Sequence, residues 1–133
     1  MFPDLKGFAV GADNNFMPDK PLTVEVRTQP GGVPLVRVLG DVDLSTAPAF
    51  QRAMQEQVTL RQKFVVDLEG VDFLSSAGLA VLVDTRKQMA DQDLKWALVA
   101  ARHTVTRPLE ITGLLTILPV FTSVPAAMDA ING

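Results

Sequence analysis

The chain has 133 residues, a net charge of −3 and no cysteine. This length is enough for one domain with its own hydrophobic core, and the lack of thiols excludes disulfides and thiolate metal sites. Its 12 basic residues are dispersed among 15 acidic ones with no more than two adjacent, so the chain has no positive run for nucleic acid and we expect no nucleic-acid partner.

The first residues lack the features of a targeting or membrane segment. They carry no basic leader, and no stretch of the chain approaches the roughly 20 uninterrupted apolar residues that span a bilayer. We therefore expect a cytoplasmic protein with no membrane partner. Residues 1–20 are rich in proline, glycine and asparagine without a sustained period, and we interpret them as an arm before a domain over residues 21–133.

The first half of this domain predicts a β-hairpin followed by a helix. Residues 22–29 alternate apolar and polar, which is typical of a half-buried strand, and residues 33–40 return as a second, antiparallel strand after the turn QPGG. From Ser45 to Val58 the apolar residues recur at helical spacing, with Ser45 or Thr46 as the expected N-cap.

The second half alternates strands with helices. The expected strands cover residues 63–68, 94–100 and 117–121. The expected helices cover residues 76–90 and 106–112 and a closing segment that Ser123 caps. The order β-β-α-β-α-β-α-β-α implies crossover connections, and hence one α/β domain with a mostly parallel sheet, an antiparallel N-terminal strand and about four helices.

Two acids, Asp41 and Asp43, are expected at the carboxyl end of the second strand, just before the first helix. Ligands bind at this edge in open α/β sheets, so an acidic pair there can hold magnesium, as in a phospho-receiver domain. Acids are also typical of a turn at a helix N-terminus. The one histidine, His103, is expected in a loop, and no catalytic or phosphate-binding motif occurs. We therefore expect no enzyme activity, no cofactor and no metal.

The stretch VVDLEGVDFLSSAGLAVLV (residues 65–83) opens as a buried strand and closes as a helix, with Ser75 and Ser76 at the junction. Ser76 is the expected N-cap, and a second hydroxyl is more than capping requires. Gly78 weakens the first helical turn by up to about 1 kcal/mol relative to alanine, and we expect it to leave the surface bare for a partner. A phosphate on Ser76 would lie at a helix N-terminus, where backbone amides favour anions.

Three segments resemble the STAS-domain anti-sigma factor antagonists of bacteria: GDVDLSTAPAF, VVDLEGVDFLSSAGLAVL and RPLEITGLLTILPVFTSVPAAMDAI. They occur in order, and the similarity covers about residues 22–131. The resemblance implies a STAS fold and a regulatory role without catalysis. It implies that the unphosphorylated protein binds an ATP-dependent serine kinase that is also an anti-sigma factor, and so releases a sigma factor. Serine phosphorylation then ends binding until a serine phosphatase removes the phosphate.

Carried over by position, the resemblance implies that Ser76 is the phosphoacceptor and that Asp43 is the acid of the neighbouring turn. The expected partner-binding residues are Asp41, Asp43, Ser45, Thr46, Ser75, Ser76, Ala77 and Gly78. Many members have Asp-Ser-Ser-Gly at the motif, whereas this chain has Ser75-Ser76-Ala77-Gly78. Ser75 therefore stays an alternative acceptor, and a member that binds its partner without being phosphorylated stays open as well.

Two rival functions remain at this point. One is a STAS subunit of another machine, such as a stress-sensing assembly or a lipid-transport complex, which shares the fold and part of the motif. The other is a small-ligand-binding or enzymatic α/β domain that uses the edge carrying Asp41 and Asp43. For the oligomeric state we expect a monomer or a weak dimer.

Overall fold

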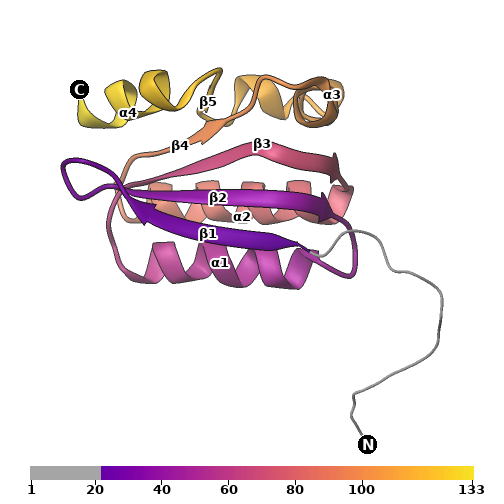
Figure 1. Ribbon diagram of the computed structural model, residues 1–133, viewed down its shortest axis with the longest axis horizontal. Coiled ribbons are helices and arrows are strands. Elements are labelled where there is room, and N and C mark those ends of the chain that lie inside the picture. The colour runs from indigo at the N-terminus through magenta and orange to yellow at the C-terminus, as the bar shows by residue number, and fades with distance from the viewer. Residues whose placement is uncertain (1–21) are drawn as a thin grey trace, which may run out of the picture.

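The computed structural model of the protein describes residues 22–133, so the expected arm at residues 1–20 lies outside them. Within the described range five strands form one sheet in the order β1-β2-β3-β4-β5 (Figure 1): β1 Thr23–Thr28, β2 Pro34–Val42, β3 Phe64–Leu74, β4 Trp96–Val99 and β5 Val120–Phe121. The helices of this range are α1 Ala47–Thr59, α2 Ser76–Asp91, α3 His103–Ile111, the short 3-10 helix η2 Leu114–Thr116 and α4 Val124–Asn132.

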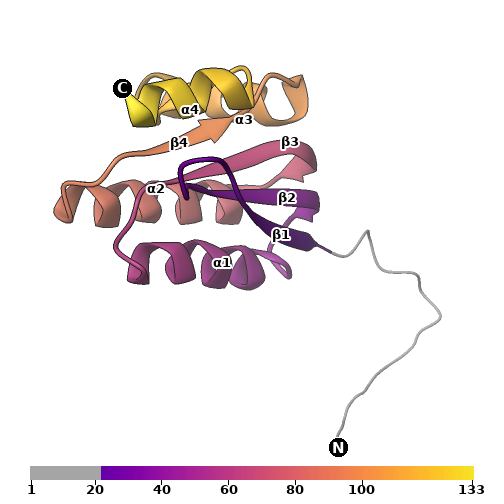
Figure 2. The same ribbon diagram turned by 60° about the vertical axis from the view of Figure 1, so that its left-hand side comes forward.

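The topology confirms the predicted α/β class and element order. β1 is antiparallel to β2, and all other neighbouring strands are parallel. The helices α1, α2 and α3 connect successive parallel strands, and because such crossovers are right-handed, all three lie on one face of the sheet. α4 follows β5 and packs on the opposite face, so that the sheet separates it from α1 (Figure 2).

Two hydrophobic clusters hold these layers together, one on each face of the sheet. Alternation along the strands sends neighbouring residues to opposite faces. Toward α1, α2 and α3, the core includes Val36, Val38, Phe64, Val66 and Leu98 from the strands and Phe50, Met54, Leu82, Met89 and Leu109 from the helices. Toward α4, it includes Leu35, Val65, Ala97 and Val99 from the strands and Ala127 and Ile131 from the helix.

The buried face of α2 differs from the predicted one. Leu79, Leu82 and Met89 are buried as expected, but Val83 is 42% exposed. Val81 and Thr85 are buried instead. A threonine can occupy this apolar face because its hydroxyl donates to the carbonyl of Val81, one helical turn earlier, at 2.8 Å.

β3 is longer than predicted, and its extension shapes the edge of the sheet where α1 and α2 begin. The strand does not end at residue 68 but continues to Leu74, with register shifts against β2 on the way. These irregularities keep Val42 beside Leu74 at the end of the two strands. As a result, β2 and β3 deliver the chain to α1 and α2 at the same edge of the sheet.

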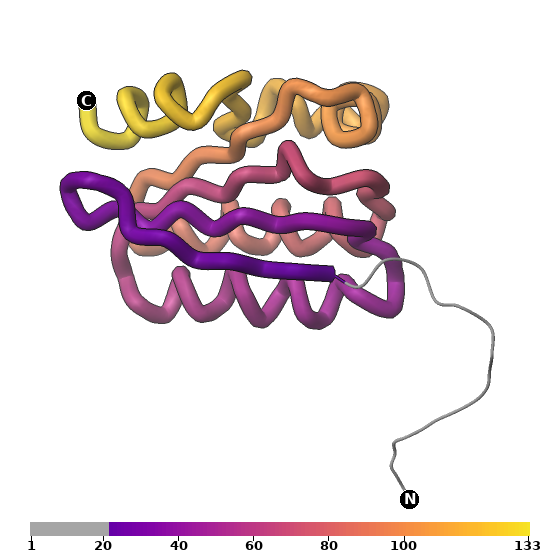
Figure 3. Tube along the Cα trace, in the orientation of Figure 1, coloured from indigo at the N-terminus to yellow at the C-terminus, as the bar shows by residue number. Residues whose placement is uncertain are grey.

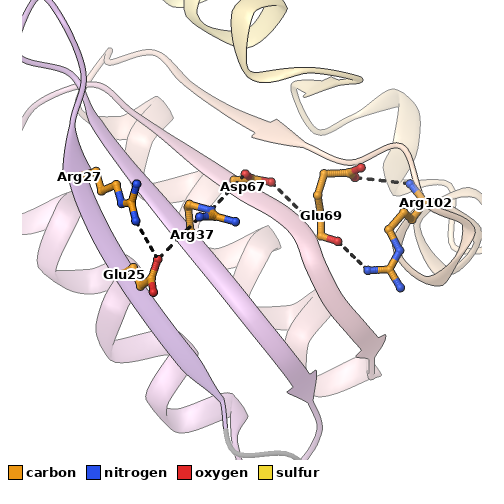
Figure 4. Close-up of polar contacts among 6 residues, drawn as sticks. All are labelled: Glu25, Arg27, Arg37, Asp67, Glu69 and Arg102. Atoms are coloured by element: carbon orange, nitrogen blue, oxygen red, sulfur yellow. Dashed lines mark hydrogen bonds and ion pairs between the residues drawn. The ribbon is translucent and has the colours of Figure 1, made fainter.

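α3 begins at His103 rather than at residue 106, so Pro108 lies inside the helix and not in its first turn. The reason is a distant carboxylate. One oxygen of Glu69 on β3 accepts the backbone N–H of Ala101 at 2.6 Å and that of Arg102 at 3.4 Å. The Arg102 guanidinium donates in return to the Glu69 carbonyl at 2.6 Å, which fixes the start of α3 against β3 (Figure 4).

The face of β1 and β2 opposite α1 carries a row of charges rather than an apolar surface. Arg27, Glu25, Arg37 and Asp67 follow one another across β1, β2 and β3, with N–O separations of 3.7–3.9 Å (Figure 4). The pairs among Arg27, Glu25 and Arg37 are exposed and contribute little to stability, whereas the Asp67 side chain at the end of the row is only 13% exposed. None of the helices formed by residues 22–133 has the length and apolar character needed to cross a membrane.

Candidate functional site

The two serine- and acid-bearing turns predicted from the sequence meet in space. The turn after β2 leads into α1 and the turn after β3 leads into α2, both at the same end of the sheet (Figure 3). A backbone hydrogen bond joins them directly, because the N–H of Ser75 donates to the carbonyl of Val42 at 2.8 Å. The structure therefore brings Asp41 and Asp43 to the same edge as Ser75 and Ser76.

Asp43 organises the first of these turns. One of its carboxylate oxygens accepts the Ser45 hydroxyl at 2.8 Å and the backbone N–H groups of Ser45 and Thr46, each at 2.9 Å. Thr46 stands at the N-cap position of α1 as expected, but its side chain makes no capping bond to the helix. Its hydroxyl donates to the carbonyl of Asp41 at 2.7 Å instead. The start of α1 is thus held by Asp43.

These hydrogen bonds give Asp43 a structural role within its own turn. One oxygen of the carboxylate, Oδ1, accepts all of these hydrogen bonds from its own turn, which is the arrangement of a residue that holds a helix start. Among residues 22–133, no group of three or more His, Cys, Asp or Glu side chains is placed to hold a metal ion. The acidic pair gives the edge a negative character.

The hydroxyl of Ser45, followed by the backbone N–H of Thr46, holds the pKa of Asp43 below its ordinary value of 3.8. A carboxyl group whose pKa is lowered on folding stabilises the protein above that ordinary value, and the contribution is lost as the pH falls through the folded pKa. We expect the Asp43 carboxyl to titrate below pH 3.8 when followed by carbon-detected NMR. Ser45→Ala should move the midpoint upward, and a midpoint at or above 3.8 in the parent would contradict the turn geometry.

In the second turn, the predicted N-cap residue was wrong. Ser75, not Ser76, is the N-cap of α2: its backbone is extended, and its side chain accepts the N–H of Gly78 at 3.3 Å. Ser76 is the first residue of the helix and is exposed. Its hydroxyl has no hydrogen-bond partner among the described residues. One serine therefore has a structural task, and the other presents a free hydroxyl.

This division predicts unequal effects of removing the two hydroxyls. Ser75→Ala should lower the free energy of unfolding by about 1 kcal/mol, the usual loss of an N-cap. Ser76→Ala should change it by less than about 0.5 kcal/mol, as for an ordinary surface substitution. Urea unfolding of both variants beside the parent checks the difference. Equal losses, or a larger loss for Ser76→Ala, would show that Ser76 carries the cap.

Gly78 also has a role other than the predicted one. It is buried and does not leave a bare surface for a partner. A Cβ at this position would lie 2.6 Å from Cγ1 of Val42 and 2.7 Å from Cδ1 of Leu74. The glycine therefore allows α2 to start directly against the ends of β2 and β3, and it positions both serines.

Two apolar residues beside this edge are exposed, which was not predicted from the sequence. Leu44 is 82% exposed in the turn before α1, and Phe73, which pairs with Asp41 across β2 and β3, is 52% exposed. The sequence did offer a sign of the exposure of Leu44, because this leucine lies between two polar residues, Asp43 and Ser45, in a tight turn. Phe73 lies beyond residue 68, where the predicted strand ended, so the sequence pattern placed its side chain on neither face of the sheet. Large apolar side chains exposed near one another often mark an interaction surface.

Comparison with known proteins agrees with this geometry. Residues 24–127 match the family model described as STAS domain. The anti-sigma-F factor antagonist RsfB of Mycobacterium tuberculosis is 32% identical over 103 residues, which cover 77% of this chain and 84% of that protein.

Solved structures extend the comparison to the fold. An anti-sigma factor antagonist from Mycobacterium paratuberculosis superposes with a TM-score of 0.80 and 31% identity over 88% of this chain and 98% of that one. The phosphorylated form of SpoIIAA from Bacillus, at 12% identity, has the same fold, with a TM-score of 0.63 over 82% of this chain and 99% of that one. The family match spans both turns of the candidate site, and the chain belongs to the STAS domain family.

Proposed function

We propose that the protein is an anti-sigma factor antagonist whose switch is Ser76. In its unphosphorylated form it binds an anti-sigma factor that is also a serine kinase, and so frees a sigma factor. Phosphorylation of Ser76 ends the complex, and a serine phosphatase restores it. The observation that carries the proposal is the free, exposed Ser76 hydroxyl at the first position of α2, beside a second serine that already supplies the helix cap. The names of the relatives point to the same role.

Phosphorylation at this position is chemically simple and structurally tolerable. The Ser76 Oγ would form a bond to the γ-phosphorus of ATP, the bond from that phosphorus to the bridging oxygen would break, and ADP would leave. The serine proton would pass to a base of the kinase. The product places a phosphate at a helix N-terminus, where the helix dipole and first-turn amides favour negative charge. The capping bond from Gly78 to Ser75 does not involve Ser76, so α2 keeps its start.

The same charge would be unfavourable in a complex. A phosphoserine carries about −1.5 to −2 charges near neutral pH. It would enter an edge that already holds Asp41 and Asp43, next to a kinase site that holds nucleotide phosphates. Like charges brought together while water is excluded oppose association strongly. The protein's own residues act here by binding and by accepting the phosphate, and we propose no catalytic role for them.

The proposal further assigns the partner surface. Asp41, Asp43, Ser45, Thr46, Ser75, Ser76 and Ala77 lie on or beside the two joined turns and are proposed to face the partner. Gly78 contributes to this surface only indirectly, because it is buried under the turn it shapes. Leu44 and Phe73 add exposed apolar area at the same edge.

The test is to incubate the protein with each purified anti-sigma kinase encoded in its own genome and ATP, then to map the modified residue by mass spectrometry. We expect one phosphate on Ser76 in the parent, the same in Ser75→Ala, and none in Ser76→Ala. Phosphate that persists at full stoichiometry on Ser76→Ala would assign the switch to another residue. Tight binding without any phosphorylation would indicate a member that lacks the switch.

A further inference from the structure

A groove runs between the N-terminal halves of α1 and α2. It has a volume of about 420 Å³, and most of its lining is apolar: Leu44, Ala47, Pro48, Ala77, Ala80 and Val81. Gln51 and Asp84 complete it. Small side chains on both helices leave the space open to solvent, because Pro48, Ala80 and Asp84 in its lining are exposed. Two of the residues that line it, Ala47 and Val81, also belong to the buried core, and none of the lining residues takes part in the phosphorylation chemistry.

We propose that this groove receives an apolar side chain of the anti-sigma partner, and that a lysine or arginine of the partner lies beside it near Asp84. The inference rests on the proposed function and adds to it the part of the surface that recognises the partner. The phosphorylation state of Ser76 then controls whether the complex forms, and the groove contributes contact area that is the same in both phosphorylation states.

Position supports this occupant. Ala77 lines the groove and directly follows Ser76, and Leu44 lines it and directly follows Asp43. The mouth of the groove is therefore continuous with the edge that carries the two turns. A kinase whose active site reaches the Ser76 hydroxyl must cover this mouth. It then also covers Leu44, which is 82% exposed in the free protein.

The chemistry of the lining selects the partner's side chains. Alanine, proline, leucine and valine form a surface that is complementary to an apolar group, as in complexes where one amphipathic element lies in a groove. Among the lining residues, Asp84 is the charged one; it is exposed and accepts a hydrogen bond from Gln88 at 2.8 Å. With Asp43 near the mouth and no cation in the lining, the groove favours a positively charged neighbour of the apolar anchor.

Another hollow of the described chain is larger but does not share this position. It measures about 590 Å³ and lies along the C-terminal half of α1, where Arg52, Gln55, Glu56 and Thr59 are among its lining residues. Leu60 and the carbon atoms of these long side chains give it an apolar surface too, but the hollow lies toward the other end of α1 from Leu44 and the two turns. It therefore gives no reason to expect the same partner there.

The experiment fills the groove and compares the result with an identical change elsewhere on α2. Ala80 and Ala90 are both exposed alanines of this helix, but only Ala80 lines the groove. Isothermal titration calorimetry would measure the binding of the parent, Ala80→Trp and Ala90→Trp to each purified anti-sigma factor of the same genome. We expect Ala80→Trp to weaken binding at least about tenfold, the scale of a buried interface contact, and Ala90→Trp to bind within about twofold of the parent.

The charge is tested in the same titrations. Asp84→Lys should weaken binding and reduce its dependence on salt, because it repels the proposed cation. Ala80→Trp that binds like the parent would overturn the groove proposal while the proposed function stands. A parent that binds none of the anti-sigma factors would overturn the proposed function, and with it this inference. A parent that self-associates in light scattering, and an Ala80→Trp that does not, would assign the groove to a second copy and overturn the proposed occupant.

Discussion

Ser76→Glu should give a folded protein that no longer binds its anti-sigma partner. Ser75 keeps the N-cap of α2, and a carboxylate in the first helical turn is stabilised by the helix dipole by about 0.3–1 kcal/mol. At the interface, the same charge lies on the edge that carries Asp43, and it must lose its water against the partner. An uncompensated buried charge of this kind destabilises a complex by about 3–5 kcal/mol. A loss of about 3 kcal/mol raises the dissociation constant more than a hundredfold.

The matched control is Ser76→Gln, which has nearly the same size and shape but no charge. Circular dichroism should give the same spectrum for the parent and both variants, and calorimetric titration should show a much larger loss for Ser76→Glu than for Ser76→Gln. Equal losses for the two variants would assign the effect to bulk at the hinge. Parental affinity in Ser76→Glu would mean that negative charge at this position is not the switch.

Gly78→Ala should destabilise the protein although alanine is the better helix former. Helix propensity alone favours the substitution by about 1 kcal/mol. The added methyl, however, would lie 2.6 Å from Cγ1 of Val42, a stiff side chain at the end of β2. Overpacking a close contact in a core destabilises a protein by about 1–3 kcal/mol, so we expect a net loss of stability and a displaced start of α2. Because that start carries Ser75 and Ser76, partner binding should weaken as well.

Urea unfolding shows whether Gly78→Ala lowers or raises the free energy of unfolding. Gly70→Ala is the control, because its nearest neighbour would be Cγ of Leu39, a flexible and partly exposed side chain, at 2.9 Å, while the backbone carbonyl of Val38 would lie 3.2 Å away. We expect a smaller loss there. A Gly78→Ala protein more stable than the parent would show that helix propensity dominates and that α2 does not depend on close packing against β2.

The alternation of strands and helices could be predicted because it depends on local periodicity. Ala47, Phe50, Ala53, Met54 and Val58 recur at helical spacing, and all five are buried in α1. The closing helix follows the same logic: Ser123 caps it as expected, accepting the N–H of Ala126 at 3.2 Å. Hydrophobic patterns and capping hydroxyls act over a few residues, so the sequence displays them directly.

The elements that depend on distant partners could not be predicted in the same way. α3 starts three residues earlier than expected because Glu69, 32 residues before Ala101, accepts the amides of Ala101 and Arg102, the two residues just before the helix. β3 runs past residue 68 because β2 pairs with the additional residues, whereas Glu69 and Gly70 resemble a turn when they are considered alone. In both cases a tertiary contact overrides a local preference.

The serine turn shows the same limit within the candidate site. Ser75 and Ser76 are equally good caps by residue type, and the choice between them depends on where β3 ends. The N–H of Ser75 donates to the carbonyl of Val42, which holds Ser75 in an extended conformation with ψ of 172°. That conformation belongs to an N-cap, so Ser76 becomes the first helical residue. The sequence could indicate the proposed switch region, but only the pairing of the strands shows which serine has the free hydroxyl.

The central claim is that phosphate on Ser76 controls binding to an anti-sigma factor. The most direct measurement is a calorimetric titration of the cognate anti-sigma factor with three samples of one preparation: the unphosphorylated protein, the protein phosphorylated stoichiometrically on Ser76, and the same protein after phosphatase treatment. We expect the unphosphorylated protein to bind tightly. The phosphorylated protein should bind more than about a hundredfold more weakly, which corresponds to roughly 3 kcal/mol, and phosphatase treatment should restore the original affinity. Equal affinity of the phosphorylated and unphosphorylated proteins would contradict the account.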